Sequence, residues 1–165
     1  MQGTEFINRL IGEMPGHHRT FPPLDKAELE AWHARWPPHS LPEDLLDLLR
    51  LTNGIRFWVH EGSPEGYYRL LALREMDSAR RIMWGEYGDD MDDDEVPYPH
   101  WLALTEHQDG ACYVVLDTDE HRYFLMDTCG PDLTSPLGNN IGGVLDYIWE
   151  SWVRELDDTL EESES

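Results

Sequence analysis

The stretch SLPEDLLDLLRLTNG, which begins at Ser40, constrains the fold most because it contains signals for both ends of a short helix. Ser40 is placed to cap the helix with Glu43 three residues later, and Pro42 is tolerated in a first turn. Asn53-Gly54 then provides a left-handed stop. We therefore predict a helix that starts close to Ser40 and ends before Gly54.

This helix is predicted to be amphipathic. Its leucines recur on one face at helical spacing: Leu41, Leu45, Leu48 and Leu49. Its charged residues lie largely opposite: Asp44, Asp47 and Arg50. We expect the leucine face to dock on a sheet and the charged face to remain in water.

Helical patterns also occur on both sides of this segment. The first carries an apolar face and ends at Pro15-Gly16: Phe6, Ile7, Leu10, Ile11 and Met14. The second starts at a capping box of Asp25 and Glu28, ends at Pro37-Pro38 and presents three apolar residues: Leu29, Trp32 and Trp36. A third covers residues 75–84 with Met76, Ala79 and Met83 on one side. The closing helix has the longest apolar face: Val144, Leu145, Ile148, Trp149, Trp152 and Leu156.

Strand patterns form two groups between these helices. IRFWVH (55–60) and YYRLLAL (67–73) flank a turn-rich segment and predict a hairpin. Residues 101–104 restart the strand pattern, and ACYVVLD (111–117) and HRYFLMD (121–127) predict a second, central hairpin across Thr118-Asp119. Residues 131–140 are expected to be irregular.

These elements predict an α+β fold. We expect a central, mostly antiparallel sheet of about 4–6 strands, with the N-terminal helices and the long C-terminal helix packed on it. Residues 1–156 are predicted to form a single domain and residues 157–165 an acidic disordered tail.

Charge limits the range of partners. The chain of 165 residues has 34 acidic and 12 basic residues and a formal net charge of −22. This charge argues against a nucleic acid or an anionic membrane as partner and permits a basic protein. No leader pattern or apolar run of membrane-spanning length is seen, so we expect a cytoplasmic protein. Cys112 and Cys129 are expected to be reduced and buried.

The candidate binding residues lie in and around an acidic run that starts at Glu86. We predict a partner-binding surface formed by Trp84, Glu86, Tyr87, Asp89, Asp90, Asp92, Asp93, Asp94, Glu95 and Tyr98. One interpretation is that the carboxylates imitate nucleic-acid phosphates in a basic cleft, with the rings as anchors. The other is a solvated run of charges without a partner. A calcium loop is excluded because Glu95 and Trp101 stand where an EF-hand needs Gly and Glu.

Patterns for other chemistry are weak. The 8 histidines lack metal-site spacing, and no nucleophile motif is present, so we predict no metal, no cofactor and no catalysis. The glycine-rich segment 138–143 is interpreted as the start of the closing helix. Carboxylates and 7 tryptophans leave a glycosidase-like site as the remaining enzyme alternative, although no spacing selects an acid pair.

The order of these motifs resembles the SUKH superfamily of bacterial immunity proteins and fungal cell-wall assembly regulators. LPEDLLDLLRLTNGI resembles its N-terminal signature, and YYRLLALREM resembles the strand and helix start that follow. WLALTEHQDGACYVVLDT is similar to its strand, acidic turn and strand, and GGVLDYIWESW to its final helix. The acidic run before Tyr98 and the acidic tail depart from the family pattern.

The resemblance implies an α+β fold without catalytic residues and a role in neutralising a cognate toxin. Together with the charge, it predicts an immunity protein that occludes the active site or substrate cleft of a basic, nucleic-acid-targeting toxin. We expect a monomer that forms a 1:1 complex. The alternative is a protein-interaction or regulatory adaptor of the same fold.

Overall fold

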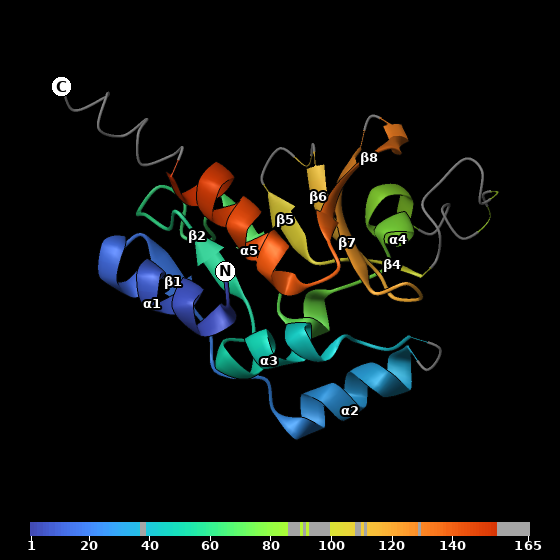
Figure 1. The fold of residues 1–165 in the computed structure, drawn as a ribbon, viewed down its shortest axis with the longest axis horizontal. Helices are drawn as coiled ribbons and strands as arrows, with labels where there is room; N and C mark the ends of the chain where they lie inside the picture. The colour runs from blue at the N-terminus through green and yellow to red at the C-terminus, as the bar shows by residue number, and fades with distance from the viewer. Residues whose placement is uncertain are drawn as a thin grey trace.

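A computed structural model describes residues 1–36, 39–85, 90, 92, 100–107, 110, 112–128 and 130–154. The helices described are α1 (Gly3–Glu13), α2 (Lys26–Arg35), α3 (Glu43–Leu51), the 3-10 helix η1 (Leu73–Glu75), α4 (Ala79–Trp84) and α5 (Ile141–Ile148), which continues as the π-helix η3 (Trp149–Arg154). The strands described are β1 (His18–Thr20), β2 (Ile55–Phe57), β3 (Tyr68–Leu70), β4 (Trp101–Ala103), β5 (Thr105–His107), β6 (Cys112–Asp117), β7 (Arg122–Asp127) and β8 (Gly130–Gly138). Figure 1 shows their arrangement.

The strands form two antiparallel sheets of four strands each, in the orders β1-β2-β3-β5 and β4-β6-β7-β8. The predicted α+β class and antiparallel pairing are confirmed, but two sheets replace the one central sheet that was predicted. The division falls at Leu104, between β4 and β5. Its amide donates to the carbonyl of Val114 and its carbonyl accepts from the amide of Leu71, both at 2.9 Å. One extended segment therefore serves both sheets.

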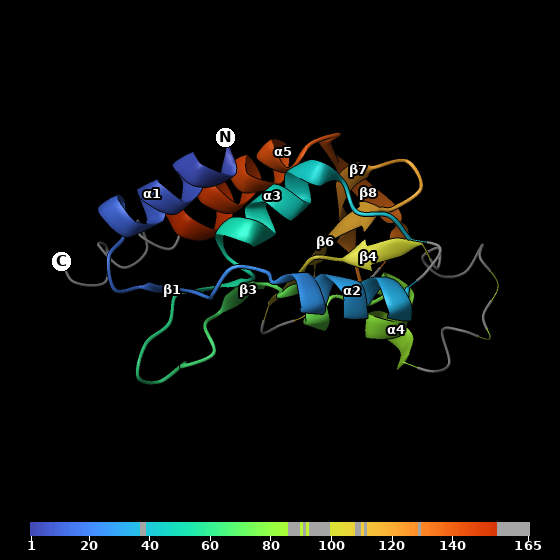
Figure 2. The ribbon, with the colours of Figure 1, turned by 90° about the horizontal axis from the view of Figure 1, so that it is seen from below.

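The first group of helices consists of α1, α3 and α5, which Figure 2 shows together on one side of β1 and β3. In the same view α2 lies level with these strands, and α4 lies below α2. The main core lies under the first group, where Phe6 makes edge-to-face contacts with Phe57 and Trp149 at centroid distances of 6.2 and 6.0 Å. A smaller core lies between α4 and the second sheet: Ala79, Ala103, Tyr113, Val115, Phe124 and Met126.

The second sheet is apolar on both faces. Val114 and Leu116 of β6 belong to the main core, whereas the intervening Val115 belongs to the smaller one. Because successive strand residues point to opposite faces, a sheet covered on both sides needs apolar residues at consecutive positions. This explains the nearly continuous apolar pattern of the central hairpin.

The leucine face of α3 is confirmed, since Leu41, Leu45, Leu48 and Leu49 are all buried. The predicted cap is wrong. The Ser40 hydroxyl lies 2.9 Å from His121 Nε2, and the helix begins at Glu43 after Pro42 at the N-cap position. Ser40 therefore joins the α2–α3 connection to the turn after β6 and does not cap α3.

The Asn53-Gly54 pair ends α3 differently from the prediction. The helix stops at Leu51, and of the two residues only Gly54 has a left-handed φ, at 108°. A Cβ on Gly54 would lie 3.1 Å from the amide nitrogen of Ala72, so the close approach of two strands also requires glycine. The buried Asn53 side chain accepts from the amide of Leu73 and donates to Glu28, each at 2.8 Å. It thereby connects α2, α3 and η1.

The N-terminal helices agree with prediction except at two residues. Ile11 is 64% exposed and is not part of the apolar face. Asp25 caps α2 by accepting from the amide of Glu28 at 2.8 Å, but the Glu28 side chain turns to Asn53 and does not complete a capping box. The helix predicted over residues 75–84 is shorter, because η1 precedes it and α4 begins at Ala79.

The segment predicted to be irregular, residues 131–140, contributes most of strand β8. This strand pairs with β7 through two register shifts and lies at the edge of its sheet. Its prolines, Pro131 and Pro136, are tolerated there because an edge strand leaves some amides unpaired and bulges interrupt the ladder. The prolines that make the sequence look irregular are therefore compatible with an edge strand.

Both predicted hairpins and the closing helix are confirmed. Cys112, predicted to be buried, is only half-buried, and burial raises the pKa of its thiol. Cys129, Leu156 and the predicted acidic tail lie outside the described residues, so the domain boundary after residue 156 stays a prediction. Within the described residues, no helix combines the length and apolar character needed to cross a bilayer.

His18 of β1 is held in its neutral form. Its Nδ1 accepts from the amide of Trp58 at 3.4 Å, which places the ring proton on Nε2, and Nε2 is buried without a hydrogen-bond partner in the described part of the chain. Burial, assisted by the neighbouring His17, lowers the pKa of His18 to about 4. Protonation would place a second N–H against the Trp58 amide.

We expect this histidine to weaken the fold in acid. Because its pKa is lower in the folded state, the unfolded chain binds the proton first, so stability is full above pH 6.5 and falls as the pH drops toward 4. The loss is on the order of 2 kcal/mol after allowance for partial solvent access. Urea unfolding between pH 7 and 4 should show a shallower decline for His18→Gln than for the wild type or for the exposed-site control His33→Gln. Parallel curves for all three proteins would contradict this role.

Candidate functional site

Most of the predicted partner surface lies outside the described residues: Glu86, Tyr87, Asp89, Asp93, Asp94, Glu95 and Tyr98. Helix α4 ends at Trp84, and the structure describes the backbone of this residue but not its side chain. Asp90 and Asp92 are described, and both are exposed. The grouping of these residues into one binding surface therefore stays a prediction.

A polar cluster surrounds the turn after β6 and includes His100, the residue before β4. The Thr118 hydroxyl donates to the His100 carbonyl at 2.8 Å and lies 2.7 Å from His39 Nδ1. Since the hydroxyl has a single hydrogen, His39 Nδ1 must carry the proton that completes the second bond. Burial lowers the pKa of His39, opposed by the charge of Asp119. These bonds fix the α2–α3 connection and the start of β4 to the same turn.

The same turn carries exposed charge. The ring of His100 lies 3.7 Å from Asp117 and 3.6 Å from Asp119, whose side chain is 65% exposed. In the part of the chain that is described, no three histidine, cysteine or acidic side chains are arranged to hold a metal ion. The described residues of this turn therefore present exposed negative charge beside His100.

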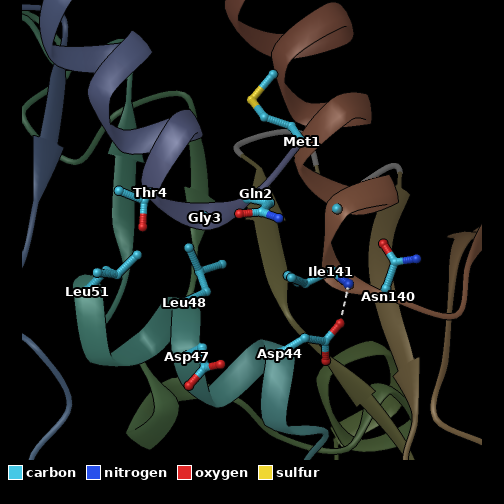
Figure 3. A pocket seen from close by; sticks show the side chains of 11 residues that line it. Met1, Gln2, Gly3, Thr4, Asp44, Asp47, Leu48, Leu51, Asn140 and Ile141 are labelled. Atoms are coloured by element: carbon cyan, nitrogen blue, oxygen red, sulfur yellow. Dashed lines mark hydrogen bonds between the residues drawn. The ribbon is translucent and has the colours of Figure 1, made fainter.

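A cavity of about 440 Å³ lies where the starts of α1 and α5 meet α3 (Figure 3). We call it the α3 cavity. Its lining combines apolar and polar groups: Met1, Gln2, Gly3, Thr4, Asp44, Asp47, Leu48, Leu51, Asn140, Ile141 and Gly142. In Figure 3, Leu48 points from α3 toward Gly3, and Asp44 and Asp47 lie on the same helix. None of these residues was a candidate site residue in the sequence.

Asp44 is the central residue of this cavity. One carboxylate oxygen accepts from the amide of Ile141 at 2.5 Å, and the other accepts from the Tyr123 hydroxyl at 3.1 Å. Asp44 thus acts as the N-terminal cap of α5, since the side chain of Asn140 makes no capping bond. Burial and the charge of Asp44 raise the pKa of Tyr123. The predicted outward position of Asp44 is wrong, because its carboxylate joins three elements.

Two glycines allow α5 to start at this place. A Cβ on Gly143 would clash with the carbonyl oxygen of Leu137, and one on Gly142 would lie 2.9 Å from the carbonyl oxygen of Met1. The glycine-rich segment does open α5, as predicted. Its glycines are also required by the close contact between α5, the end of β8 and the start of α1.

The rim of the α3 cavity is negatively charged. Glu43 and Asp47 share one guanidinium nitrogen of Arg50, at 2.5 and 2.9 Å. Asp146 pairs with the amino group of Met1 at 2.9 Å. Leu51, which lines the cavity, is 44% exposed and is one of the few large apolar side chains in the described residues that face solvent. The arrangement combines an apolar wall with carboxylates, which suits binding of an amphipathic group.

Comparison with known proteins identifies the class of fold. The family model described as SMI1 / KNR4 family (SUKH-1) matches residues 23–153, which include α3, the acidic run, both hairpins and α5. No curated protein matches the chain. The matched region contains Asp44 and the α3 side of the cavity, whereas α1 precedes it.

Asp44 provides a direct test of the geometry at this site. We expect Asp44→Ala to lower the free energy of unfolding by about 2–4 kcal/mol, because the Tyr123 hydroxyl and the first amide of α5 lose their acceptor. Tyr123→Phe should cost about 1 kcal/mol, and the double variant should be less than additive. Urea unfolding of the four proteins measures these changes. A value within 0.5 kcal/mol of wild type for Asp44→Ala would show that the carboxylate does not support α5.

Proposed function

The chain belongs to the SMI1/KNR4 (SUKH-1) family, and we propose that it is an immunity protein that binds a basic toxin and blocks its active site or substrate cleft. The family includes toxin immunity proteins and fungal regulators, and its members are generally non-catalytic. Binding takes place in the cytoplasm of the producing cell as a 1:1 complex, and the toxin acts on nucleic acid.

The observation that carries this proposal is the internal use of the basic residues. At least nine of the 12 lie within 4 Å of a carboxylate in the part of the chain that the structure describes: Arg9, Lys26, Arg35, Arg50, Arg56, Arg69, Arg74, Arg122 and Arg154. A chain with a net charge of −22 therefore has few cations left for its remaining carboxylates. A basic partner supplies what the chain itself lacks.

The excess negative charge also favours rapid association with a basic toxin, which an inhibitor needs. Complementary charge raises association rates toward about 10⁸ to 10⁹ M⁻¹s⁻¹ at low salt. Asp90 and Asp92 of the acidic run are exposed, as is Asp119 on the turn after β6, and all three contribute to this field. Charge on an exposed rim contributes more to rate than to affinity, so the complex also needs buried anchors.

A regulatory adaptor is the second candidate, because the same family includes fungal regulators. An adaptor binds a protein that is harmless when produced alone. An immunity protein binds one that arrests growth and is neutralised in the complex. Expression of the partner with and without this chain separates the two functions.

The acidic run is the part of the surface to test. We expect capture from the source cell to yield a basic protein that is toxic when produced alone and harmless when produced with this chain. Changing Asp89, Asp90, Asp92, Asp93 and Asp94 to Asn should weaken the complex roughly tenfold or more and reduce its salt dependence. Titration calorimetry at two salt concentrations measures both effects.

The matched control has the same change in charge at exposed positions elsewhere: Glu5, Glu13, Glu30, Glu61 and Glu150, each changed to Gln. This variant should bind within about twofold of wild type at moderate salt. If both variants weakened binding equally, the acidic run would contribute to binding only through the net charge of the protein. A captured partner that is neutral and harmless would refute the immunity proposal.

A further inference from the structure

We propose that the α3 cavity receives one arginine side chain of the protein partner. The identity of the partner rests on the proposed function, whereas the chemistry of the cavity rests on its own geometry. The cavity thus supplies the anchor that exposed carboxylates alone do not provide.

The shape of the cavity suits a long side chain with an apolar stem. Leu48, Leu51 and Ile141 supply apolar wall, and Gly3 contributes a wall without a side chain. A Cβ on Gly3 would lie 3.2 Å from Leu48 Cδ1, so the absence of this atom keeps α1 close to α3. Leu51 stays 44% exposed at this site, where the methylene groups of an arginine would cover it.

The charge at the rim is one cation short. Glu43 and Asp47 share the single guanidinium of Arg50, so these three residues carry one net negative charge. The amino group of Met1 is paired with Asp146, which leaves no net charge in that pair. The charge of Asp44 faces the positive end of α5 through its bond to Ile141. One guanidinium from a partner would balance the rim.

The cavity favours a guanidinium over other groups. An anion would face Asp44 and Asp47, which lie one helical turn apart on α3. A purely apolar group would remove water from Asp47 without providing a donor, which is costly. Arginine offers several N–H donors in a planar fork, and it is weakly hydrated, so it enters such a site at a lower desolvation cost than lysine.

The inference can be tested on the intact chain without a partner. N-acetyl-arginine amide is titrated into ¹⁵N-labelled protein and compared with N-acetyl-citrulline amide, which has nearly the same shape without the charge. We expect saturable amide shifts at Gly3, Leu51 and Gly142 with arginine, at least tenfold weaker binding of citrulline, and loss of the arginine response in Asp47→Asn. Equal binding of the two probes, or shifts confined to other surfaces, would overturn the inference.

The complex provides a second, independent readout. With the captured partner, Asp47→Asn and Leu51→Ala should each weaken binding about tenfold, while Glu30→Gln on α2 should change it less than twofold. Thermal melts confirm that each variant is folded. Undiminished binding by both cavity variants would overturn the inference and leave the proposed function intact. Absence of any toxic partner would remove the proposed function, and the arginine titration would still decide the chemistry of the cavity.

Discussion

The hydrogen bond from the first amide of α5 to the Asp44 carboxylate connects helix α3 to helix α5. Helix α3 precedes all strands except β1, and α5 follows the last of them, so their contact closes the fold around both sheets. A helix start leaves several amides without partners, and here a carboxylate from a distant helix satisfies one of them. The same carboxylate accepts from Tyr123 of β7, so sheet and helices meet at one charged group. The α3 cavity exists because these elements converge without filling the space between them.

Most of the basic residues of this fold form ion pairs with carboxylates of the same chain. Arginines are used to hold segments together, as where Arg35 pairs with Asp77 across 42 residues of sequence. Arg69 pairs with Glu106 on the neighbouring strand and also lies 3.8 Å from Glu75. Each such pair neutralises a carboxylate locally and leaves one fewer cation for the rest of the surface. The field around the molecule is therefore set by the excess of carboxylates over basic residues, 34 against 12.

The sequence was sufficient to predict elements whose signals are local. The leucine spacing of α3, the two hairpins and the apolar face of α5 follow from periodicity, because burial on one side requires it. Strand β8 was missed because Pro131 and Pro136 are read as breakers, and their tolerance depends on a position at the sheet edge. The division into two sheets at Leu104 was missed for a similar reason. This division depends on which strands pair with each other, and the strand propensity of a segment does not indicate the strand with which it pairs.

The candidate site was harder to predict than the fold because its residues are ordinary in sequence. Asp44 was assigned to the solvent face by helical spacing, yet its position in the first turn allows it to reach α5, which follows almost 100 residues later. The acidic run was conspicuous, but conspicuous charge contributes mainly long-range attraction. Stable recognition requires a place where a partner's side chain loses its water and finds both apolar contact and a matching charge. Among the described residues, the α3 cavity combines apolar wall and carboxylates because α1, α3 and α5 pack together, so neither composition nor local periodicity could indicate it.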